Sequence, residues 1–540
     1  MRSDCYGRQP LLTLMRKRTL DLKEGYRQNL ALLGSLHVGK STLLKQYLAE
    51  LDEPGILPVY LDLENRDLRY FASKLVRSLL YHVAKAKGLP VSEDLETLIA
   101  TVRPVLPVAA EEVARLQALV QEGKCTEAFE GLLDLPDRFT NGTGLFCVLI
   151  LDEFQALEGY GVADIFKKLA DRIMAQKNCL YIIASSFEEQ ARRILSERLT
   201  LLFGNFELVP VEPFDLKVSQ EFIEKRMGGI KVGLQLRHFL SDFTGGRPLY
   251  LDLILQELTS LSATFRQQEI YTPLMAQAIE NMLFDRWGAL SRHFELIVGR
   301  LCSGRTNRLT MDILMALAGG HHRVNDMVTK LGAKKTPVIH KLAMLVDEDV
   351  VERNGTHFHV KDKLFRYWIK YVFQKRLETI ELEPGRLKKE FKEEVGRAIS
   401  AFHATSRRDL PTRVTELLSC FDREQLRLQG RRYELPRFEE IRAVKIRQRS
   451  GGAVDALEAQ TSEGKWLLVL RKDPMIESDI GAIVEEVRTM PDRPKRCVIV
   501  SLSELDEAAR LRALEERMWI WNEPEINALM NLFDKPYIVP

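Results

Sequence analysis

The sequence of 540 residues predicts an α/β protein in which a parallel sheet comes first, helices follow, and a second α/β domain ends the chain. Three observations lead to this class. Short apolar runs alternate with helical patterns up to about Asp215, which favours a parallel sheet with helices on both faces. Beyond Asp215 the patterns become helical. After about residue 386, strand and helix patterns alternate again.

Four apolar runs in the first part are predicted strands: Leu30–Leu33, Leu57–Glu64, Leu145–Leu151 and Leu180–Ser186. Helical spacing predicts helices over Ser41–Leu51 and Val162–Gln176, and a further apolar stretch, Phe206–Phe214, closes this part. From about residue 67 to residue 137 the patterns are helical, with no strand signal. The tetrapeptide Asn141–Gly144 (NGTG) predicts a turn before the third strand.

Helices dominate the middle of the chain, and four are predicted: Val218–Met227, Leu234–Thr244, Leu249–Leu261 and Thr272–Arg286. A compact unit follows from Leu309 to Arg376. It reads helix, turn, helix (His322–Leu331), turn, helix (Pro337–Asp347). Two short strands come next, around Asn354-Gly355, a dipeptide that is typical of type I′ hairpin turns.

The C-terminal part begins after a predicted linker, Leu382–Arg386. Its pattern reads helix, then three strands (Arg442–Ile446, Ala453–Gln460 and Trp466–Arg471), and then helix, strand, helix, strand, helix. Together these patterns predict four domains, over residues 1–215, 216–300, 301–383 and 384–540.

Charge and cysteine content narrow the class of protein. The 78 Lys and Arg against 76 Asp and Glu give a net charge of +2, so any nucleic-acid surface is expected to be a local patch. The 7 cysteines are scattered without a CxxC pair, which argues against a disulfide framework or a structural zinc site. No apolar run approaches the roughly 20 residues that cross a bilayer, and the N-terminal MRSDCYGRQP has no apolar signal core. We therefore expect a soluble cytoplasmic protein.

The segment Gly34–Ser41 (GSLHVGKS) fits the pattern GxxxxGK[ST] between a predicted strand and a predicted helix. In such a loop the backbone N–H groups and the helix N-terminus bind phosphates, and the glycines let the backbone approach them. Lys40 is expected to reach the β- and γ-phosphates, and the Ser41 hydroxyl to bind Mg²⁺. The pattern therefore predicts ATP and Mg²⁺ as ligands. Eight residues are expected to contact the nucleotide: Gly34, Ser35, His37, Val38, Gly39, Lys40, Ser41 and Thr42.

A second motif supplies acidic residues. The apolar third strand ends in Asp152 and Glu153, which is the Walker B pattern. Asp152 is expected to bind Mg²⁺ through water and Glu153 to polarise the attacking water, so Glu153 and Lys40 are the predicted catalytic residues. The fourth strand ends in two serines, and Ser185 is predicted to contact the γ-phosphate or the water. The sequence does not separate Ser185 from Ser186, and a turn-forming role is the alternative for both.

Together these motifs resemble the archaeal-type ATPases of the STAND/AAA+ branch of P-loop NTPases. Tyr6–Leu14 (YGRQPLLTL) is similar to that family's motif F-x-GR-x-x-E-x-x-x-L, departing at Leu12, where the family has an acidic residue. Thr244–Pro248 (TGGRP) is similar to the GG-x-P motif of the family's helical lid, which implies that Arg247 and Pro248 contact the nucleotide. The same residues also fit a helix C-cap followed by a proline at the start of the next helix. The cap and the nucleotide contact are compatible with each other. The resemblance covers about residues 5–376. It places no arginine finger, and three arginines are candidates by position only, with a solvated helix face as the alternative: Arg192, Arg193 and Arg198.

The helix-turn-helix pattern followed by two strands matches a winged helix. The helix at the recognition position, Lys335–Asp347, carries three basic or titratable side chains, and the wing carries Arg353 and His357. Those on the helix are Lys335, His340 and Lys341. In DNA-binding winged helices such a helix enters the major groove and the wing touches phosphate. Three acidic residues at the helix end argue against a basic face: Asp347, Glu348 and Asp349. In STAND-like ATPases this unit often serves as a rigid contact between domains, and both roles stay open.

The C-terminal strands place Asp455 on one strand and Lys472 at the end of the next. Val454-Asp455 … Leu470-Arg471-Lys472 resembles the PD-(D/E)xK nucleases, in which carboxylates bind Mg²⁺ and the lysine steadies the attacked phosphate. Leu470 stands where that family has its second carboxylate, and a site with one carboxylate binds Mg²⁺ poorly. The resemblance therefore implies a degenerate, inactive nuclease fold. A generic α/β domain with Asp455 and Lys472 at its surface is the alternative.

Basic residues gather between Arg427 and Arg449, with Tyr433 and Phe438 among them, which suits a groove for a phosphate backbone or, alternatively, a solvated charged face. They are Arg431, Arg432, Arg437, Arg442, Lys445, Arg447 and Arg449. The leading interpretation is an ATP-hydrolysing regulatory switch that acts on or near DNA. The alternatives are a STAND-type signalling or scaffold ATPase whose C-terminal domain binds protein and, less favoured, an active ATP-dependent nuclease. The expected partners are ATP with DNA or a protein and no membrane, and the oligomeric state stays open.

Overall fold

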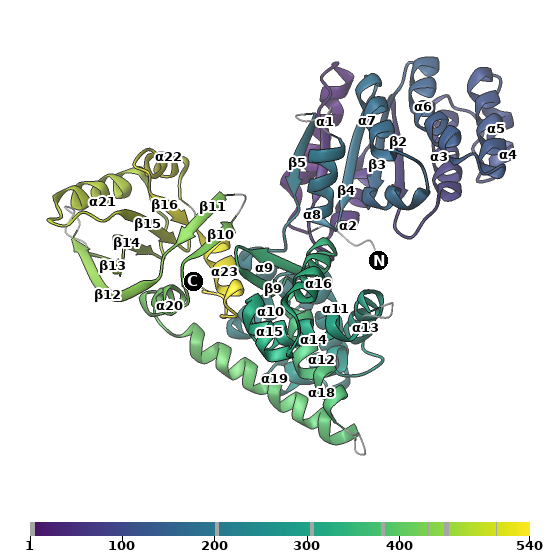
Figure 1. Ribbon diagram of the computed structural model, residues 1–540. Coiled ribbons are helices and arrows are strands. Elements are labelled where there is room, and N and C mark those ends of the chain that lie inside the picture. The colour runs from purple at the N-terminus through teal and green to yellow at the C-terminus, as the bar shows by residue number, and fades with distance from the viewer. Residues whose placement is uncertain are drawn as a thin grey trace. The chain divides into compact units, whose positions relative to one another are not determined.

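The structure, a computed structural model, describes residues 6–199, 205–302, 307–379, 384–428, 431–447, 453–503 and 505–539. The chain forms two compact units (Figure 1). The first comprises the described residues up to Pro213 together with Asp347–Asp349. The second comprises Phe214–Val346 and continues from Val350 toward the C-terminus. Within the described ranges, no helix is long and apolar enough to cross a membrane.

The first unit is built on a parallel sheet of five strands, as predicted for this part of the chain. The order across the sheet is β2-β3-β4-β1-β5, and all neighbouring strands run parallel. The strands are β1 (Asn29–Leu33), β2 (Ile56–Asp62), β3 (Phe146–Asp152), β4 (Cys179–Ser185) and β5 (Phe206–Pro210). Because β4 lies between β1 and β3, the carboxyl ends of these three strands meet at one edge of the sheet.

Alternate residues of each strand pack on opposite faces of this sheet. One set, which includes Leu30, packs against α1 (Gln9–Lys23) and α2 (Lys40–Glu50). The other set, which includes Ala31, packs against α7 (Ile165–Ala175) and the helices inserted between β2 and β3. Helices on both faces explain why the strands read as continuous apolar runs.

Four helices are inserted between β2 and β3: α3 (Leu68–Ala86), α4 (Leu95–Val102), α5 (Pro107–Gln121) and α6 (Cys125–Thr143). Figure 1 shows them beside β2, which α3 contacts. The turn predicted at Asn141–Gly144 is wrong, because α6 continues through Thr143. The Thr143 hydroxyl donates to the carbonyl oxygen of Phe139 (2.6 Å), and Gly144 ends the helix with a φ of +71°. Three short elements complete the unit: η1 (Phe154–Tyr160), α8 (Glu188–Arg193) and η2 (Ile194–Arg198).

The second unit opens with helices, and the four predicted there are confirmed within a few residues. They are α9 (Leu216–Met227), α10 (Leu234–Thr244), α11 (Pro248–Phe265) and α12 (Thr272–Leu283), with β6 (Lys231–Val232) and β7 (Glu269–Ile270) among them. The elements that follow are α13 (Ala289–Leu301), α14 (Asn307–Ala318), α15 (Val324–Leu331), α16 (Lys335–Asp347), β8 (Val351–Asn354), β9 (His357–Val360), α17 (Lys363–Trp368), η4 (Ile369–Phe373) and α18 (Gln374–Glu378).

The hairpin between β8 and β9 forms, but its turn is not of type I′. Asn354 pairs with His357, so the turn residues are Gly355 and Thr356. A type I′ turn needs a positive φ at both turn residues. Of the two, only Gly355 has one, +63°.

The long helix α19 (Pro384–Ser406) leads from the helical part to the C-terminal domain (Figure 1). The linker predicted over Leu382–Arg386 is therefore wrong from Pro384 onward, where proline occupies the first turn of the helix. Leu382 and Glu383 lie outside the described residues.

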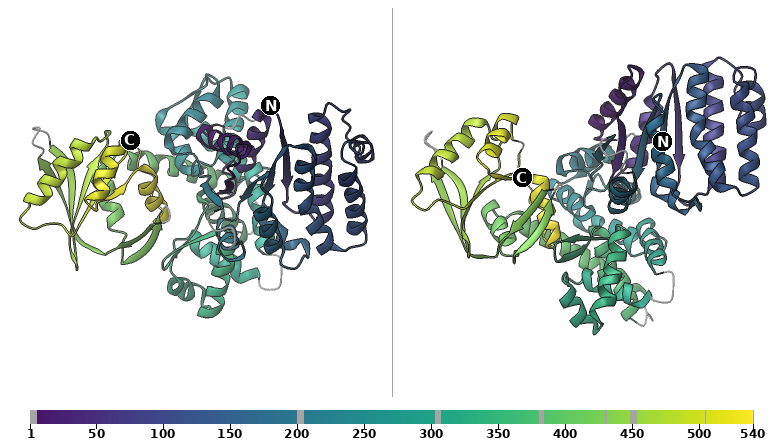
Figure 2. Two further views of the ribbon diagram at one scale, coloured as in Figure 1. Left: turned by 90° about the horizontal axis from the view of Figure 1, so that it is seen from above. Right: turned by 45° about the horizontal axis from the view of Figure 1, so that its top comes forward.

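The C-terminal domain, green to yellow in Figure 2, has a mixed sheet. The strand order is β12-β13-β14-β15-β16, antiparallel among the first three strands and parallel among the last three. The strands are β12 (Phe438–Arg447), β13 (Ala453–Thr461), β14 (Gly464–Arg471), β15 (Arg496–Ser501) and β16 (Trp519–Trp521). One face packs against α21 (Glu477–Thr489) and α22 (Glu507–Glu515). The other packs against α20 (Leu410–Leu418), α23 (Glu523–Leu532) and a hairpin that was not predicted, β10 (Glu424–Leu428) with β11 (Arg431–Leu435).

Candidate nucleotide-binding site

The loop from Gly34 to Gly39 joins β1 to α2 and adopts a conformation that few residue types allow. Gly39 precedes α2 with a φ of +95°, and His37 has a φ of +66°, in the left-handed region that non-glycine residues rarely adopt. A Cβ atom on Gly34 would lie 2.2 Å from the carbonyl oxygen of Val211. Glycine is therefore required at both ends of the loop.

Lys40, the first residue of α2, folds back into this loop. Its Nζ donates to the carbonyl oxygens of Gly34 (2.7 Å) and Ser35 (3.0 Å), and only 4% of the residue is exposed. Burial lowers the pKa of Lys40, whereas the charges of Glu153 and Asp152 raise it. The ammonium group thus lies inside the loop, close to the two acidic residues that end β3.

Asp152 is 1% exposed at the end of β3. Its Oδ2 accepts a hydrogen bond from the hydroxyl of Tyr60 at 2.8 Å, and the Ser41 hydroxyl interacts with the same carboxylate. Its Oδ1 is buried and has no hydrogen-bond partner among the described residues. Burial raises the pKa of Asp152, and the contacts from Ser41 and Tyr60 lower it.

These oxygens fit a magnesium ion. A buried carboxylate oxygen without a partner costs free energy unless a ligand binds it. Mg²⁺ takes oxygen ligands, commonly one or two carboxylates completed by waters and the phosphates of a nucleotide. Asp152 and Ser41 supply the protein oxygens of such a site, directly beside the phosphate loop.

Glu153 follows with a φ of +54°, and both oxygens of its carboxylate accept hydrogen bonds. The backbone N–H of Ser186 (2.9 Å) and the side-chain amide of Gln155 (2.8 Å) donate to Oε2. The Ser186 hydroxyl donates to Oε1. The carboxylate predicted to polarise water is therefore bound by three donors in this structure.

The two serines at the end of β4 make different contacts. The hydroxyl of Ser185 is buried and accepts a hydrogen bond from the backbone N–H of Phe187 at 3.1 Å, which is a turn-forming contact. Ser186 contacts Glu153 instead. The strand-end serine that reaches the predicted catalytic glutamate is thus Ser186, next to the residue that the sequence assigned.

Three residues around the site were not predicted from the sequence. Tyr60 and Gln155 bind the two Walker B carboxylates. Arg8 donates to the carbonyl oxygen of Val38 in the loop (3.2 Å) and to that of Glu212. Arg8 belongs to the N-terminal motif, whose Leu12 is 1% exposed and packs in the core. Counted from Gly7-Arg8, the acidic position of the family motif falls on Leu11, which packs partly buried against the same core. The remaining predicted contacts, Ser35 and Thr42, lie in the loop and in the first turn of α2.

The motif Thr244–Pro248 belongs to the second unit and forms the turn between α10 and α11. Gly245 and Gly246 have φ values of +61° and +67°, and Pro248 begins α11. Arg247 is 6% exposed, and its Nε lies 3.4 Å from Oδ2 of Asp362. The helix-cap interpretation is thus observed, and Arg247 already has an acidic neighbour within its own unit.

The arginine-finger candidates lie on α8 and η2. Arg192 and Arg198 are exposed, and Arg198 forms an ion pair with Glu158 at 2.5 Å. Exposure and a surface ion pair are the features of a solvated helix face.

The helix-turn-helix elements α14–α16 and the hairpin β8–β9 occur in the predicted order. Lys335 and His340 are exposed on α16. The hairpin, in contrast, packs within its own unit: a Cβ on Gly355 would lie 2.3 Å from the carbonyl oxygen of Gln425, and His357 is 7% exposed. Arg353 is exposed and donates to the carbonyl oxygen of Gly355 at 3.1 Å. These contacts favour the domain-contact role for the hairpin.

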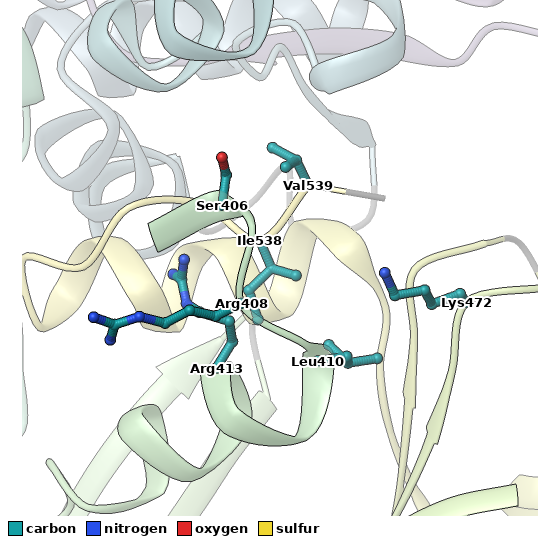
Figure 3. A pocket seen from close by; sticks show the side chains of 7 residues that line it. All are labelled: Ser406, Arg408, Leu410, Arg413, Lys472, Ile538 and Val539. Carbon is teal, nitrogen blue, oxygen red and sulfur yellow. The ribbon is translucent and has the colours of Figure 1, made fainter. Parts of the chain in front are cut away.

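The residues of the nuclease-like motif lie on neighbouring strands, Asp455 on β13 and Leu470 on β14, and Lys472 directly follows β14. Asp455 is exposed and lies 3.9 Å from Lys445, and Leu470 is 4% exposed in the core. Lys472 lines a shallow pocket with Ser406, Arg408, Leu410, Arg413, Ile538 and Val539. Figure 3 shows Lys472 pointing toward Ile538, while the guanidinium groups of the two arginines point away from it. The described residues contain no cluster of three or more His, Cys, Asp or Glu that could bind a metal.

Three side chains of the basic stretch lie in the described part of the chain: Arg437, Arg442 and Lys445. Arg437 is exposed, whereas Arg442 pairs with Glu440 (2.7 Å) and Lys445 lies near Asp455. The side chains of four other arginines lie outside the described part of the chain: Arg427, Arg431, Arg432 and Arg447. Arg449 lies outside it entirely.

No protein-family model and no curated protein matches the sequence. Among solved structures, the chain is similar to the Walker-type ATPase PABY2304 of Pyrococcus abyssi, with 17% identity and a TM-score of 0.48, over 68% of this chain and 97% of that one. It is also similar to the ORC2 protein of Aeropyrum pernix in its ADPNP–ADP complexes, with 13% identity and a TM-score of 0.41, over 74% and 98% of the two chains. A third similar chain is the RuvB Holliday junction branch migration motor of Thermotoga maritima, with 12% identity and a TM-score of 0.35, over 68% and 95%.

Proposed function

We propose that this protein binds ATP with Mg²⁺ and hydrolyses it. The observation that carries the proposal is the unpartnered Oδ1 of Asp152, buried beside Ser41 and Lys40 at the edge where β1, β3 and β4 end. A carboxylate, a hydroxyl and an ammonium group around a loop at a helix N-terminus are the groups that a magnesium-bound triphosphate requires.

Each residue has a defined task in this reaction. The loop N–H groups and Lys40 bind the phosphates, and Lys40 exchanges its two carbonyl partners for phosphate oxygens. Asp152 and Ser41 would hold Mg²⁺, which neutralises charge on the β- and γ-phosphates. Glu153 accepts a proton from the attacking water or orients it.

The hydrogen bonds of Glu153 support a low basal rate. Both oxygens of this carboxylate are occupied by hydrogen-bond donors, so the attacking water has to displace one of them before the carboxylate can bind it. Turnover then requires Glu153 to exchange at least one donor for the attacking water. We propose a regulatory ATPase on this basis, with a rate set by that exchange.

Two substitutions test the site. Lys40→Ala should abolish ATP binding in calorimetry, because it removes the side-chain cation from the loop. Lys45, exposed one turn later on α2, is the matched control, and Lys45→Ala should bind ATP like the wild type. Glu153→Gln should keep ATP bound and slow hydrolysis at least tenfold, since the residues proposed for Mg²⁺ remain. Unchanged ATP affinity in Lys40→Ala would contradict the proposal.

We further propose that the ATPase acts on or near DNA, through α16 and the basic stretch of the C-terminal domain. The exposed Lys335 and His340 on the helix-turn-helix unit support this role. The competing function is a STAND-type signalling or scaffold ATPase whose C-terminal domain binds protein. The packing of the β8–β9 hairpin within its own unit supports that alternative.

We propose that the C-terminal domain is a degenerate member of the PD-(D/E)xK fold. An antiparallel set of three strands followed by parallel strands supports it. The exposed Asp455, with Lys445 as its near neighbour, and the buried Leu470 support an inactive domain that binds a partner rather than cleaving DNA.

A further inference from the structure

A cavity of about 340 Å³ lies among the four helices inserted between β2 and β3, and we call it the α3–α5 cavity. One face of α3 and one face of α5 supply most of its lining, and α4 and α6 supply one residue each. The lining residues are Arg69, Ala72, Ser73 and Val76 on α3, Leu95 on α4, Leu116, Gln117, Val120 and Gln121 on α5, and Leu132 on α6. Pockets that bind small molecules have volumes of roughly 300–1,000 Å³, so this cavity is large enough for a small ligand.

Two small residues leave this space open. Ala72 is 8% exposed and places only a methyl group on the α3 side of the cavity. On α6, a Cβ atom on Gly131 would lie 2.3 Å from Cδ2 of Leu116, so the absence of a side chain there lets Leu116 pack against that helix. Because protein interiors are otherwise closely packed, larger residues at these two positions would take up the space.

The α3–α5 cavity is apolar at its base and polar at its mouth. Leu116 and Leu132 are 1% and 0% exposed, so they form the base. The polar lining residues form two pairs with i, i+4 spacing, which places each pair on one side of its helix. These pairs are Arg69 with Ser73 and Gln117 with Gln121; Gln117 is half-buried and the other three residues are exposed.

The polar groups at the mouth are available to a ligand. Within the described residues, the side chains of Arg69, Ser73, Gln117 and Gln121 form no hydrogen bond or ion pair. The lining contains no Asp or Glu that would compensate the charge of Arg69. A guanidinium group in this setting favours a ligand with a carboxylate, because hydrogen bonds between two charged groups are stronger than those between neutral groups.

We propose that the α3–α5 cavity binds a small aliphatic carboxylate, with its acyl chain on Leu116 and Leu132 and its head group at Arg69. The apolar lining consists of Ala, Val and Leu, with no aromatic ring on which a base or another planar group would stack. The volume lies at the lower end of the range for small-molecule pockets, which favours a chain of medium length. The proposal is independent of the proposed function, because all lining residues belong to the helical insertion.

Calorimetry on the full chain, with octanoate, hexanoate and octan-1-ol, tests the site. Octanoate should bind the wild type about tenfold more tightly than hexanoate, because it buries two more methylene groups. Arg69→Gln should weaken octanoate binding about fivefold and leave octan-1-ol binding unchanged, since only the carboxylate pairs with the guanidinium group. Arg77→Gln is the matched control: Arg77 is exposed on the same helix and does not line the cavity, so this variant should bind both ligands like the wild type.

Two variants that fill the cavity locate the acyl chain. Ala72→Leu should abolish binding of octanoate and of octan-1-ol, because the larger side chain occupies the space of the ligand. Ser73→Phe should do the same from an exposed position at the mouth, where a substitution leaves the core intact. Melting followed by circular dichroism shows which variants are folded.

The outcomes separate this site from the phosphate loop. Absence of octanoate binding to the wild type overturns the proposal, and so does wild-type binding in a folded Ala72→Leu or Ser73→Phe variant. If Arg69→Gln weakens both ligands equally, or neither, the head group is not recognised as a carboxylate and the proposal is wrong. ATP binding, measured by calorimetry on the same samples, tests the proposed function separately.

Discussion

At the scale of single residues, the contacts of Glu153 bear most directly on the proposed hydrolysis. The residue has a φ of +54°, a conformation that costs about 1–2 kcal/mol for a residue with a side chain. Its carboxylate is bound by Ser186 and Gln155. The left-handed backbone and the three donors hold the carboxylate beside the end of β4, and we infer that the Ser186 hydroxyl restrains its contact with the attacking water.

Removal of the Ser186 hydroxyl should therefore raise basal hydrolysis. Ser186→Ala eliminates the donor to Oε1 and leaves the backbone donor to Oε2, so we expect a rate a few-fold higher with unchanged ATP affinity. Ser185→Ala is the matched control, because its hydroxyl contacts the backbone of Phe187 and not the glutamate. Steady-state ATPase assays measure both. A rate in Ser186→Ala as low as in Glu153→Gln would show that Ser186 positions the glutamate and does not restrain it.

Glu523 supplies a prediction on pH and stability. Burial and the nearby charge of Asp215 raise its pKa to about 7, although the N–H of Leu216 lowers it. Between its unfolded pKa, near 4.5, and about 7, the folded chain binds more protons than the unfolded chain, so stability falls as pH rises through this window. We expect the second unit to lose on the order of 1 kcal/mol between pH 5 and pH 8 from this group.

Urea unfolding followed by tryptophan fluorescence measures this loss, because all 5 tryptophans belong to the second unit. Glu523→Gln should remove that part of the pH dependence. Glu477→Gln alters an exposed first-turn glutamate of α21 and should leave it in place. An unchanged pH dependence in Glu523→Gln would contradict the prediction.

At the scale of elements, the turn between α10 and α11 requires two glycines for different reasons. Gly246 has a φ of +67°, and a Cβ there would lie 2.0 Å from the carbonyl oxygen of Phe214. Gly245 has a φ of +61°, and a Cβ added to Gly245 would have no heavy atom within 4 Å. Gly245→Ala should cost about 1–2 kcal/mol, the penalty of the left-handed backbone alone. Gly246→Ala should cost clearly more, because the backbone of Phe214 has to move. Urea unfolding by tryptophan fluorescence compares the two, and equal costs would contradict the role of the Phe214 contact.

At the same scale, most helices and strands were predictable because the order of apolar and polar residues follows the burial of each element. Strands buried on both faces read as apolar runs, which located β1 and β3 within one or two residues. The turn at Asn141–Gly144 was mispredicted because a helix that packs Phe139 in the core accepts Asn and Thr in its last turn and needs only Gly144 to end. The hairpin β10–β11 was missed because its charged residues conceal an alternation in which Leu426, Tyr433 and Leu435 are buried.

Site residues that belong to a local sequence motif were predictable. Those that reach the site from a neighbouring strand were not. Lys40 and Asp152 are recognised by spacing from a glycine or from the end of an apolar run. Tyr60 reaches Asp152 from the neighbouring strand, at a sequence separation of 92 residues, and no local pattern marks it. The choice between Ser185 and Ser186 needed the direction of each side chain at the end of β4.

At the scale of the whole molecule, the salt dependence of DNA affinity tests where the proposed nucleic-acid contacts lie. Arg431→Ala, Arg432→Ala and Arg437→Ala together should weaken DNA binding for all sequences. They should also lower the slope of log affinity against log salt by about 2–3, because each phosphate contact releases a counterion. Lys335→Ala with His340→Ala should weaken binding independently if α16 also contacts DNA. Fluorescence anisotropy at several salt concentrations measures both sets. DNA binding that neither set affects would favour the protein-binding scaffold.

The last prediction is that the full chain does not cleave DNA. One exposed carboxylate, Asp455, faces Lys445, while the position of the expected second carboxylate is Leu470, buried against the strand that carries Val500. A hard divalent cation sheds its water only where several oxygens replace it, and a single exposed carboxylate does not supply them. Duplex, single-stranded and branched DNA should therefore stay intact with Mg²⁺ or Mn²⁺, with and without ATP, on a gel that resolves single nicks. Metal-dependent cutting that disappears in Asp455→Ala would make this domain an active nuclease, whereas cutting that persists in that variant would come from a contaminating enzyme. Arginine contacts to phosphate do not require a metal, so DNA binding without cleavage is the combination that the proposed degenerate nuclease domain predicts.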